Sequence, residues 1–301
     1  MVYSHESFRV LTTARRLMLL SIGCWLAAGL ATQWPTHAQE RLPFSKPAWK
    51  AIFTGVELTE LKASEPRLMV GYAVRIDLTA PGIRFLATPD NGDRPKETDG
   101  LKTSSFLTKH RLQVAINAAP FGPIHSVEGQ PQDVVGLQVS QGKLVSPADN
   151  NAPALLISKR NQARIAAPPF DLDEVENAVA GFSIVLKNGK VVQGDQSIHP
   201  RTAAGISGDG KTLYWLVIDG RQKDYSQGAT TGEVGEWLAA LGCTEGINLD
   251  GGGTTTLVRA LPGPDGQPVA KIINRPIHAG IPGTERVAAS HLGLFALPLK
   301  K

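Results

Sequence analysis

Short apolar runs separated by Gly, Pro, Asn and Asp recur along most of the chain. Runs of this kind, bounded by turn residues, are typical of β-strands. The pattern therefore predicts a strand-rich fold. The expected strands are 68–76, 83–87, 112–116, 134–139, 154–157, 183–186, 212–218, 246–249 and 272–273.

Gly-containing dipeptides predict tight turns within this strand pattern. Asn188-Gly189 joins two apolar runs by a two-residue hairpin signal, and Gln141-Gly142 resembles it. Asp209-Gly210 lies inside the segment 205–212, which matches the Walker A phosphate-binding pattern letter for letter. A phosphate-binding loop must open a helix, whereas the residues after this segment continue as a strand. We therefore expect a hairpin turn here and no nucleotide site.

One stretch has clear helical periodicity. Apolar residues recur every three or four positions in 231–241, Thr230 and Glu233 have the spacing of a capping box, and Gly242 supplies a C-terminal stop. The helix lies between two predicted strands, and this order is typical of a right-handed parallel crossover. We expect an α+β fold: a strand-rich mixed sheet with few helices, including one βαβ-like unit (212–249).

The predicted crossover brings two carboxylates together. Asp219 follows the first of its strands and Asp250 follows the second. Because the carboxyl ends of parallel strands open onto one edge of a sheet, where α/β sites usually lie, both side chains are expected at a common site.

The segment 248–256 reads Asn-Leu-Asp-Gly-Gly-Gly-Thr-Thr-Thr. Three consecutive glycines carry a heavy cost in conformational entropy, so they indicate a tight turn or a close approach of the backbone to another group. One interpretation is a structural turn between strands. The other is a cradle for an anion or a sugar, lined by backbone N–H groups and Thr hydroxyls, with the Asp250 carboxylate at its lip.

Arginines stand near these carboxylates in the sequence. Arg221 follows Asp219 by two residues, and Arg201 and Arg275 lie among apolar residues. A guanidinium is well shaped for bidentate phosphate recognition, although a surface ion pair would also explain Asp219 with Arg221. Capping of the helix already explains Glu233.

Composition narrows the function classes. The chain is 42% hydrophobic and 19% charged, as in soluble globular proteins, and its net charge of +4 is spread without a basic cluster. We therefore expect no nucleic-acid partner. The histidines are scattered and the two cysteines, Cys24 and Cys243, cannot form a Cys-based zinc site. We predict no metal and no cofactor.

The first residues have the order of a secretory signal peptide. Three arginines precede the apolar run 17–31, and Ala38 ends a short small-residue segment. We predict a signal peptide (1–38), a single catalytic domain (39–301), a periplasmic or secreted location and no stable membrane span after cleavage. A transmembrane anchor would need about 20 apolar residues, and a lipoprotein attached through Cys24 is a further alternative. Cys243, then the remaining cysteine, is expected to be buried.

Several short motifs occur in an order that resembles the phosphodiester glycosidase family. The resemblance covers roughly 112–294. The motifs are Arg-Thr-Ala-Ala-Gly (201–205), Val-Ile-Asp-Gly-Arg-Gln (217–222), Ser226 with Gly228, Thr230 and Glu233, Asn-Leu-Asp-Gly-Gly-Gly (248–253) and Asn-Arg-Pro (274–276), with an earlier run at 115–121.

This resemblance implies hydrolysis of a sugar 1-phosphodiester at the anomeric carbon, with release of free sugar and a phosphomonoester. The implied substrate is a sugar-phosphate glycoconjugate or polysaccharide. The catalytic candidates are Asp219, Asp250 and Glu233. The candidate substrate or phosphate ligands are Asn117, Arg201, Thr202, Arg221, Ser226, Gly228, Thr230, Asn248, Gly251, Gly252, Gly253, Thr254, Asn274 and Arg275.

Two other classes stay open at this stage. A secreted carbohydrate-binding protein would use the same cradle without turnover. A periplasmic phosphodiesterase acting at phosphorus would need a metal or an activated nucleophile, which the scattered histidines do not favour.

Overall fold

A computed structural model describes residues 42–149, 151–264 and 266–300. The predicted signal peptide lies outside the described residues. Within them the chain forms antiparallel sheets, and none of their helices is long and apolar enough to cross a membrane.

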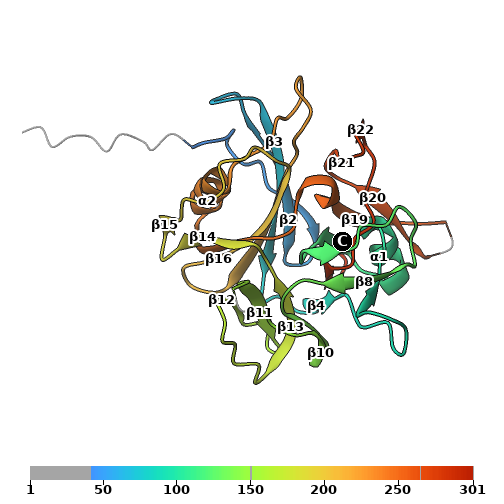
Figure 1. Cartoon of the computed structure of the whole chain (residues 1–301). Coiled ribbons are helices and arrows are strands. Elements are labelled where there is room, and N and C mark those ends of the chain that lie inside the picture. The colour runs from blue at the N-terminus through green and yellow to red at the C-terminus, as the bar shows by residue number, and fades with distance from the viewer. Residues whose placement is uncertain (1–41, 150, 265, 301) are drawn as a thin grey trace, which may run out of the picture. The chain divides into compact units, whose positions relative to one another are not determined.

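The largest sheet has eight strands in the order β1-β2-β3-β17-β16-β18-β14-β15. Figure 1 shows several of them beside helix α2 (Thr231–Ala240). The strands are β1 (Lys50–Phe53), β2 (Val56–Ala63), β3 (Met69–Asp77), β14 (Ser183–Lys187), β15 (Lys190–Val191), β16 (Arg201–Ser207), β17 (Thr212–Ile218) and β18 (Cys243–Asn248).

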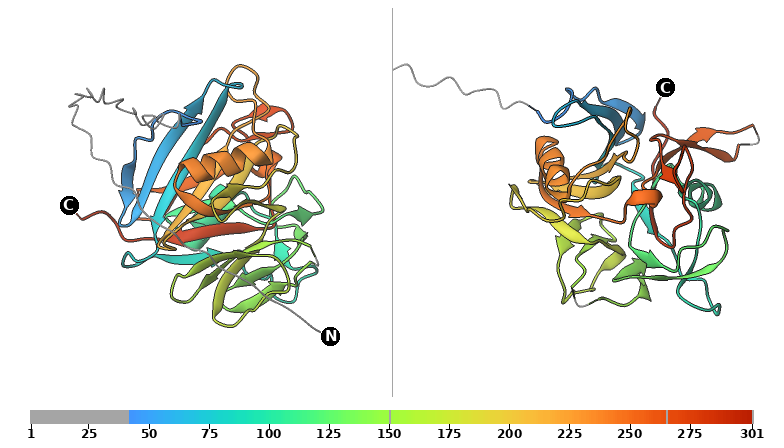
Figure 2. Two further views of the ribbon diagram at one scale, coloured as in Figure 1. Left: turned by 90° about the vertical axis from the view of Figure 1, so that its left-hand side faces the viewer. Right: turned by 45° about the horizontal axis from the view of Figure 1, so that its top comes forward.

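Helix α2 covers one face of this sheet (Figure 2). Val234, Trp237 and Leu238 project from α2 into an apolar cluster with side chains of β3, β16 and β17. Thr230 and Glu233 form the predicted capping box, and Cys243 is buried in the same cluster, as expected.

Two five-stranded sheets complete the main framework. One has the order β20-β19-β6-β23-β4, and helix α1 (Thr103–His110) packs against it; the other has the order β10-β9-β13-β11-β12. The strands of the first are β4 (Arg84–Ala87), β6 (Val114–Asn117), β19 (Leu257–Pro262), β20 (Pro268–Ile272) and β23 (His291–Phe295). Those of the second are β9 (Gln138–Ser140), β10 (Lys143–Ser146), β11 (Ala154–Ser158), β12 (Ala163–Ala166) and β13 (Val175–Ala180).

Short elements border the sheets. They are the three-stranded sheet of β5 (Thr98–Asp99), β8 (Pro131–Val134) and β7 (Phe121–Gly122), the hairpin of β21 (Ile277–His278) and β22 (Ile281–Pro282), and the 3₁₀ turn η1 (Gly252–Thr254).

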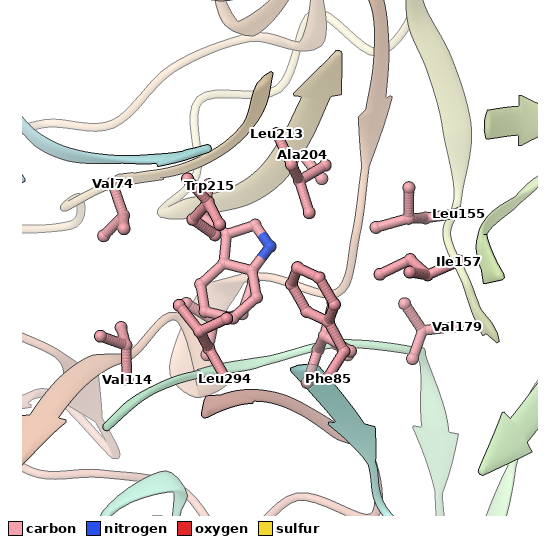
Figure 3. Packing of buried hydrophobic residues seen from close by; sticks show 14 of the residues in the cluster. Val74, Phe85, Val114, Leu155, Ile157, Val179, Ala204, Leu213, Trp215 and Leu294 are labelled. Carbon is pink, nitrogen blue, oxygen red and sulfur yellow. The ribbon is translucent and has the colours of Figure 1, made fainter. Parts of the chain in front are cut away.

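The main core lies where the three large sheets meet (Figure 3). Trp215 of β17 contacts Phe85 of β4 edge to face, with ring centroids 6.2 Å apart. Leu155 of β11 and Val179 of β13 close the cluster from the third sheet. Because all three sheets bury apolar side chains here, their edges are held in a fixed arrangement.

The strand-rich fold with few helices is as predicted, but the mixed sheet is wrong. Every strand pairing among the described residues is antiparallel. Strands β17 and β18 run parallel across α2, as the βαβ-like unit (212–249) requires, yet they are not neighbours. Strand β16 lies between them and pairs antiparallel with both. The hairpin at Asp209-Gly210 folds β17 back onto the preceding strand β16. Strand β16 therefore occupies the position beside β17 that β18 would need.

The local turn predictions are confirmed. Asn188-Gly189 joins β14 to β15, Gln141-Gly142 joins β9 to β10, and the Walker-like segment 205–212 spans a hairpin between two strands. The predicted strand 134–139 is instead split between β8 and β9, because Gly136 adopts a left-handed conformation with φ 87°.

Candidate active site

A cavity of about 450 Å³ opens at the edge of the large sheet where β18 ends and β16 begins. Six of the predicted site residues line it: Arg201, Arg221, Asn248, Asp250, Gly251 and Gly252. Its other lining residues are Phe182, Ser183, Gly194, Asp195, His199, Pro200, Thr231, Leu249 and Arg286.

Asp250 is the carboxylate of this cavity that follows the glycine-rich motif. Strand β18 delivers it to the edge of the sheet, and Thr254 Oγ1 donates a hydrogen bond of 2.7 Å to Asp250 Oδ2. Burial raises the pKa of Asp250 to about 6, against the opposing influence of the hydrogen bonds from Thr254 and the Gly251 backbone and of the Arg286 charge. A carboxylate with this pKa is mostly ionised at neutral pH, and it has the properties that a general base or nucleophile needs.

The three glycines allow close packing around this carboxylate. Gly252 has φ 65°, and its N–H donates to Pro200 O at 2.9 Å. A Cβ at Gly252 would lie 3.1 Å from the Arg221 guanidinium, and one at Gly253 would lie 2.6 Å from that of Arg286. Glycine is therefore needed here so that two guanidiniums can lie directly against the loop backbone.

Arg221 and Arg286 lie beside the glycine loop, and the charge of Arg286 also acts on the Asp250 carboxylate. Within the described parts of the chain, neither forms an ion pair with a carboxylate. Burial and the neighbouring guanidiniums of Arg286 and Arg201 lower the pKa of Arg221. Two adjacent cations without a counter-ion repel each other, and an anionic ligand would relieve that repulsion.

Arg201 has a different role, because three of its five N–H donors are already used within the protein. Its Nε donates to Ala229 O at 2.9 Å, and its Nη2 donates to Asp195 Oδ2 at 2.9 Å and to Ser197 O at 2.6 Å. Arg201 thus fixes the loop 192–200, which forms one wall of the cavity.

Asn117 lies behind the glycine loop as a hydrogen-bonding hub. Its Nδ2 donates to Asp250 O at 2.7 Å and to Thr254 Oγ1 at 3.2 Å, and its Oδ1 accepts from Thr202 Oγ1 at 2.7 Å and from Thr256 N at 3.2 Å. It is 1% exposed and has no capacity left for a ligand. Asn248 differs, because it lines the cavity and its buried Oδ1 has no partner among the described residues.

Asp219 is not among the residues that line the cavity. It is 1% exposed, and its Oδ1 accepts from Asn274 Nδ2 at 2.8 Å. Its Oδ2 accepts from Arg275 N at 2.9 Å and from Tyr225 Oη at 3.1 Å. Burial raises its pKa, and these donors oppose the shift. The carboxylate ties the segment 274–275 to the end of β17.

The remaining predicted residues support the walls. Ser226 Oγ donates to Asp219 O at 2.6 Å, and Thr230 caps α2. Glu233 completes the capping box and pairs with Arg67, which itself donates to Gly228 O. Arg275 is exposed, with its guanidinium over the Tyr225 ring.

Sequence reasoning did not select four residues that surround Asp250 and the glycine loop: His199, His278, Arg286 and Phe182. Arg286 had one signal, since it lies among apolar residues like the other arginines. The histidines had none, because they are far apart in the chain. Among the residues described, no group of His, Cys, Asp and Glu is arranged to hold a metal ion.

The fold and the site define an antiparallel β-protein in which a carboxylate and two unpaired guanidiniums line one cavity beside a glycine loop. Residues 110–295, more than half of the chain, match the sequence model of the phosphodiester glycosidase family. The chain belongs to this family. No curated protein matches it in sequence.

Solved structures share the fold at low sequence identity. The catalytic domain of zebrafish N-acetylglucosamine-1-phosphodiester alpha-N-acetylglucosaminidase, auto-inhibited by its pro-peptide, has a TM-score of 0.58 at 19% identity, over 85% of this chain and 89% of that one. A Burkholderia pseudomallei protein with the provisional name of exported protein has a TM-score of 0.54 at 15% identity, over 79% and 76%. A Synechocystis protein of no stated function has a TM-score of 0.57 at 13% identity, over 85% of this chain and 69% of that one.

Proposed function

We propose that the protein hydrolyses a sugar 1-phosphodiester at the anomeric carbon and releases free sugar and a phosphomonoester. The observation that carries this proposal is that Asp250, Arg221 and Arg286 share one cavity. Membership of the phosphodiester glycosidase family supports the same reaction.

Asp250 acts at the anomeric carbon in this proposal. Glycoside cleavage passes through a transition state with oxocarbenium character, which a carboxylate stabilises or attacks. Thr254 holds Asp250 Oδ2, and Asn117 holds the Asp250 carbonyl, so the carboxylate is fixed before the substrate arrives.

Arg221 and Arg286 bind the phosphate of the substrate. A phosphomonoester leaving group has a second pKa of about 6, so its departure needs less protonation than that of a sugar alkoxide. Two guanidiniums that stabilise the developing negative charge can therefore take the place of a strong general acid.

Asp219 supports this site from a distance. Two of the hydrogen bonds that it accepts hold the segment 274–275, and Asn274 Nδ2 also donates to Thr255 O at 3.0 Å, next to the glycine loop. In the proposal Asp219 and Glu233 position the site, and Asp250 carries the chemistry.

The test uses purified protein and a panel of methyl esters of hexose 1-phosphates. We expect free hexose and methyl phosphate as products, and an activity loss of about a thousandfold or more in Asp250→Asn. Asp93→Asn, in an exposed loop, is the matched control and should retain full activity. Release of hexose 1-phosphate, or oxygen from isotopically labelled water in the methyl phosphate, would place the cleavage at phosphorus. Wild-type turnover in Asp250→Asn would end the assignment.

We further propose that the chain is exported, as the arginine-rich start and the apolar run 17–31 indicate. N-terminal sequencing of protein from an extracytoplasmic fraction should find an N-terminus near Gln39. Cytoplasmic protein that retains residues 1–38 would contradict this.

A further inference from the structure

Each of the two unpaired arginines of the cavity has a histidine ring nitrogen as its neighbour. Arg221 Nη2 lies 3.4 Å from His199 Nδ1, and Arg286 Nε donates to His278 Nδ1 at 3.2 Å. A guanidinium can only donate, so each Nδ1 must be the acceptor. Both rings are then neutral and carry their proton on Nε2.

The backbones of both histidines are held in place. His199 N donates to Ala229 O at 3.2 Å, and Ala229 N donates to His199 O at 2.9 Å. Gly228 packs on this backbone so closely that a Cβ there would lie 2.7 Å from the His199 carbonyl. His278 belongs to β21, which pairs with β22 and packs against η1 of the glycine loop. The backbone that carries each imidazole is therefore fixed beside the arginine that the ring contacts.

The surroundings favour the neutral form of both rings. Burial lowers the pKa of His199, and the Arg221 and Arg201 charges lower it further, with Asp195 opposing them. Burial and the Arg286 charge lower the pKa of His278. Hydrogen-bond geometry and electrostatics thus agree on the same protonation state.

A neutral partner has a consequence that a carboxylate would not have. Arg201 shows the usual arrangement, because Asp195 orients it and also neutralises it. An imidazole orients a guanidinium and leaves its full positive charge available to a ligand. Arg221 and Arg286 are oriented in this way, each by a neutral imidazole.

We propose that His199 and His278 are positioning residues that hold Arg221 and Arg286 against the glycine loop, so that both guanidiniums face the phosphate of the substrate with their charge intact. The substrate-side part of this inference rests on the proposed function. Neither histidine touches the reacting atoms in it.

Calorimetric titration of the full chain with inorganic phosphate tests the inference without requiring turnover. We compare His278→Leu, which removes the acceptor, His278→Asn, whose Oδ1 can replace Nδ1, and His278→Asp, which keeps an acceptor but adds a negative charge. The same three changes are made at His199. His125→Leu, outside the cavity, is the control.

The Leu and Asp variants should bind phosphate at least about tenfold more weakly, which corresponds to about 1.4 kcal/mol. The phosphate affinity of the Asn variants should stay within about threefold of wild type. The melting temperatures of the variants should not follow the order of their phosphate affinities. With a sugar 1-phosphodiester, the Leu variants should raise KM and also lower kcat, because the guanidiniums that they release both bind the phosphate and stabilise its developing charge. A purely structural role predicts instead that Leu and Asn lose stability together.

The outcomes separate this inference from the proposed function. Phosphate binding with the expected order of variants, in a protein that cleaves no sugar 1-phosphodiester, would overturn the reaction and keep the positioning role. Turnover with unchanged phosphate affinity and KM in the Leu variants would overturn the positioning role alone. The positioning role would also be overturned if the wild-type protein bound no phosphate.

Discussion

Asp250 links the proposed chemistry of the cavity to the stability of the fold. The fold raises its pKa from the ordinary value of 3.8 to about 6, mainly by burial. The folded protein therefore binds the proton more tightly than the unfolded chain. Its contribution to stability is fully present below pH 3.8 and is lost as pH rises through about 6.

Replacing this carboxylate should consequently stabilise the protein while it removes activity. Asp250→Asn keeps the shape of the side chain and removes the partly buried charge, so at pH 8 its melting temperature should equal or exceed that of wild type. At pH 4 the gain should disappear. Thermal melts at the two pH values check this, and a variant that melts well below wild type at pH 8 would show that the carboxylate is structural.

Arg221 offers a second test at the scale of one residue. It adopts φ 59°, a left-handed conformation that costs an arginine and a lysine about the same. Arg221→Lys should therefore leave the melting temperature unchanged. A lysine presents one point charge in place of a planar fork, so we expect kcat/KM to fall about ten- to a hundredfold. Activity within twofold of wild type would show that Arg221 makes no bidentate contact.

At the scale of elements, helix α1 depends on a residue far away in the chain. Its N-cap, Lys102, provides no side-chain cap, and the Glu285 carboxylate accepts from Ser104 N at 3.0 Å instead. Glu285 is 8% exposed and precedes Arg286, so the same contact anchors a wall of the site.

Removing this contact should destabilise the fold moderately. Glu285→Ala leaves a helix N–H without its partner and should cost about 1 to 2 kcal/mol in the free energy of unfolding. Glu285→Gln keeps an acceptor oxygen and should cost less. Urea unfolding of both variants measures the difference, and equal losses would show that packing, and not the cap, is responsible.

At the scale of the whole molecule, a buried histidine links the packed sheets to acid stability. His291 of β23 is fully buried, stacks on Phe106 at 4.8 Å between ring centroids, and lies 3.2 Å from Thr88 Oγ1 through its Nδ1. Burial lowers its pKa from 6.5 to about 3. The contribution of His291 to stability is present above pH 6.5 and is lost as pH falls toward 3, because the unfolded chain takes up the proton first.

This histidine should contribute up to about 1.4 kcal/mol per pH unit to the loss of stability in that window. His291→Gln cannot titrate, so its free energy of unfolding should depend less steeply on pH between 6.5 and 4, even if the variant is less stable at pH 7.5. Urea midpoints across this range measure the slope. Equal slopes in the two proteins would assign acid unfolding to other groups.

The sequence by itself determined the local features. Dipeptides such as Asn188-Gly189 set the hairpins, the spacing of Thr230 and Glu233 set the start of α2, and the glycine run marked the segment around Asp250. These features depend on the backbone preferences of a few neighbouring residues, which can be recognised from the sequence alone.

Only the tertiary structure decided which of these features meet. It inserted β16 between β17 and β18, directed Asp219 toward Asn274 and away from the cavity lining, and brought Arg286 beside Arg221. Each outcome depends on which surfaces the three sheets bury against one another. That choice is collective: burial of the shared core determines it, and no short stretch of residues carries it.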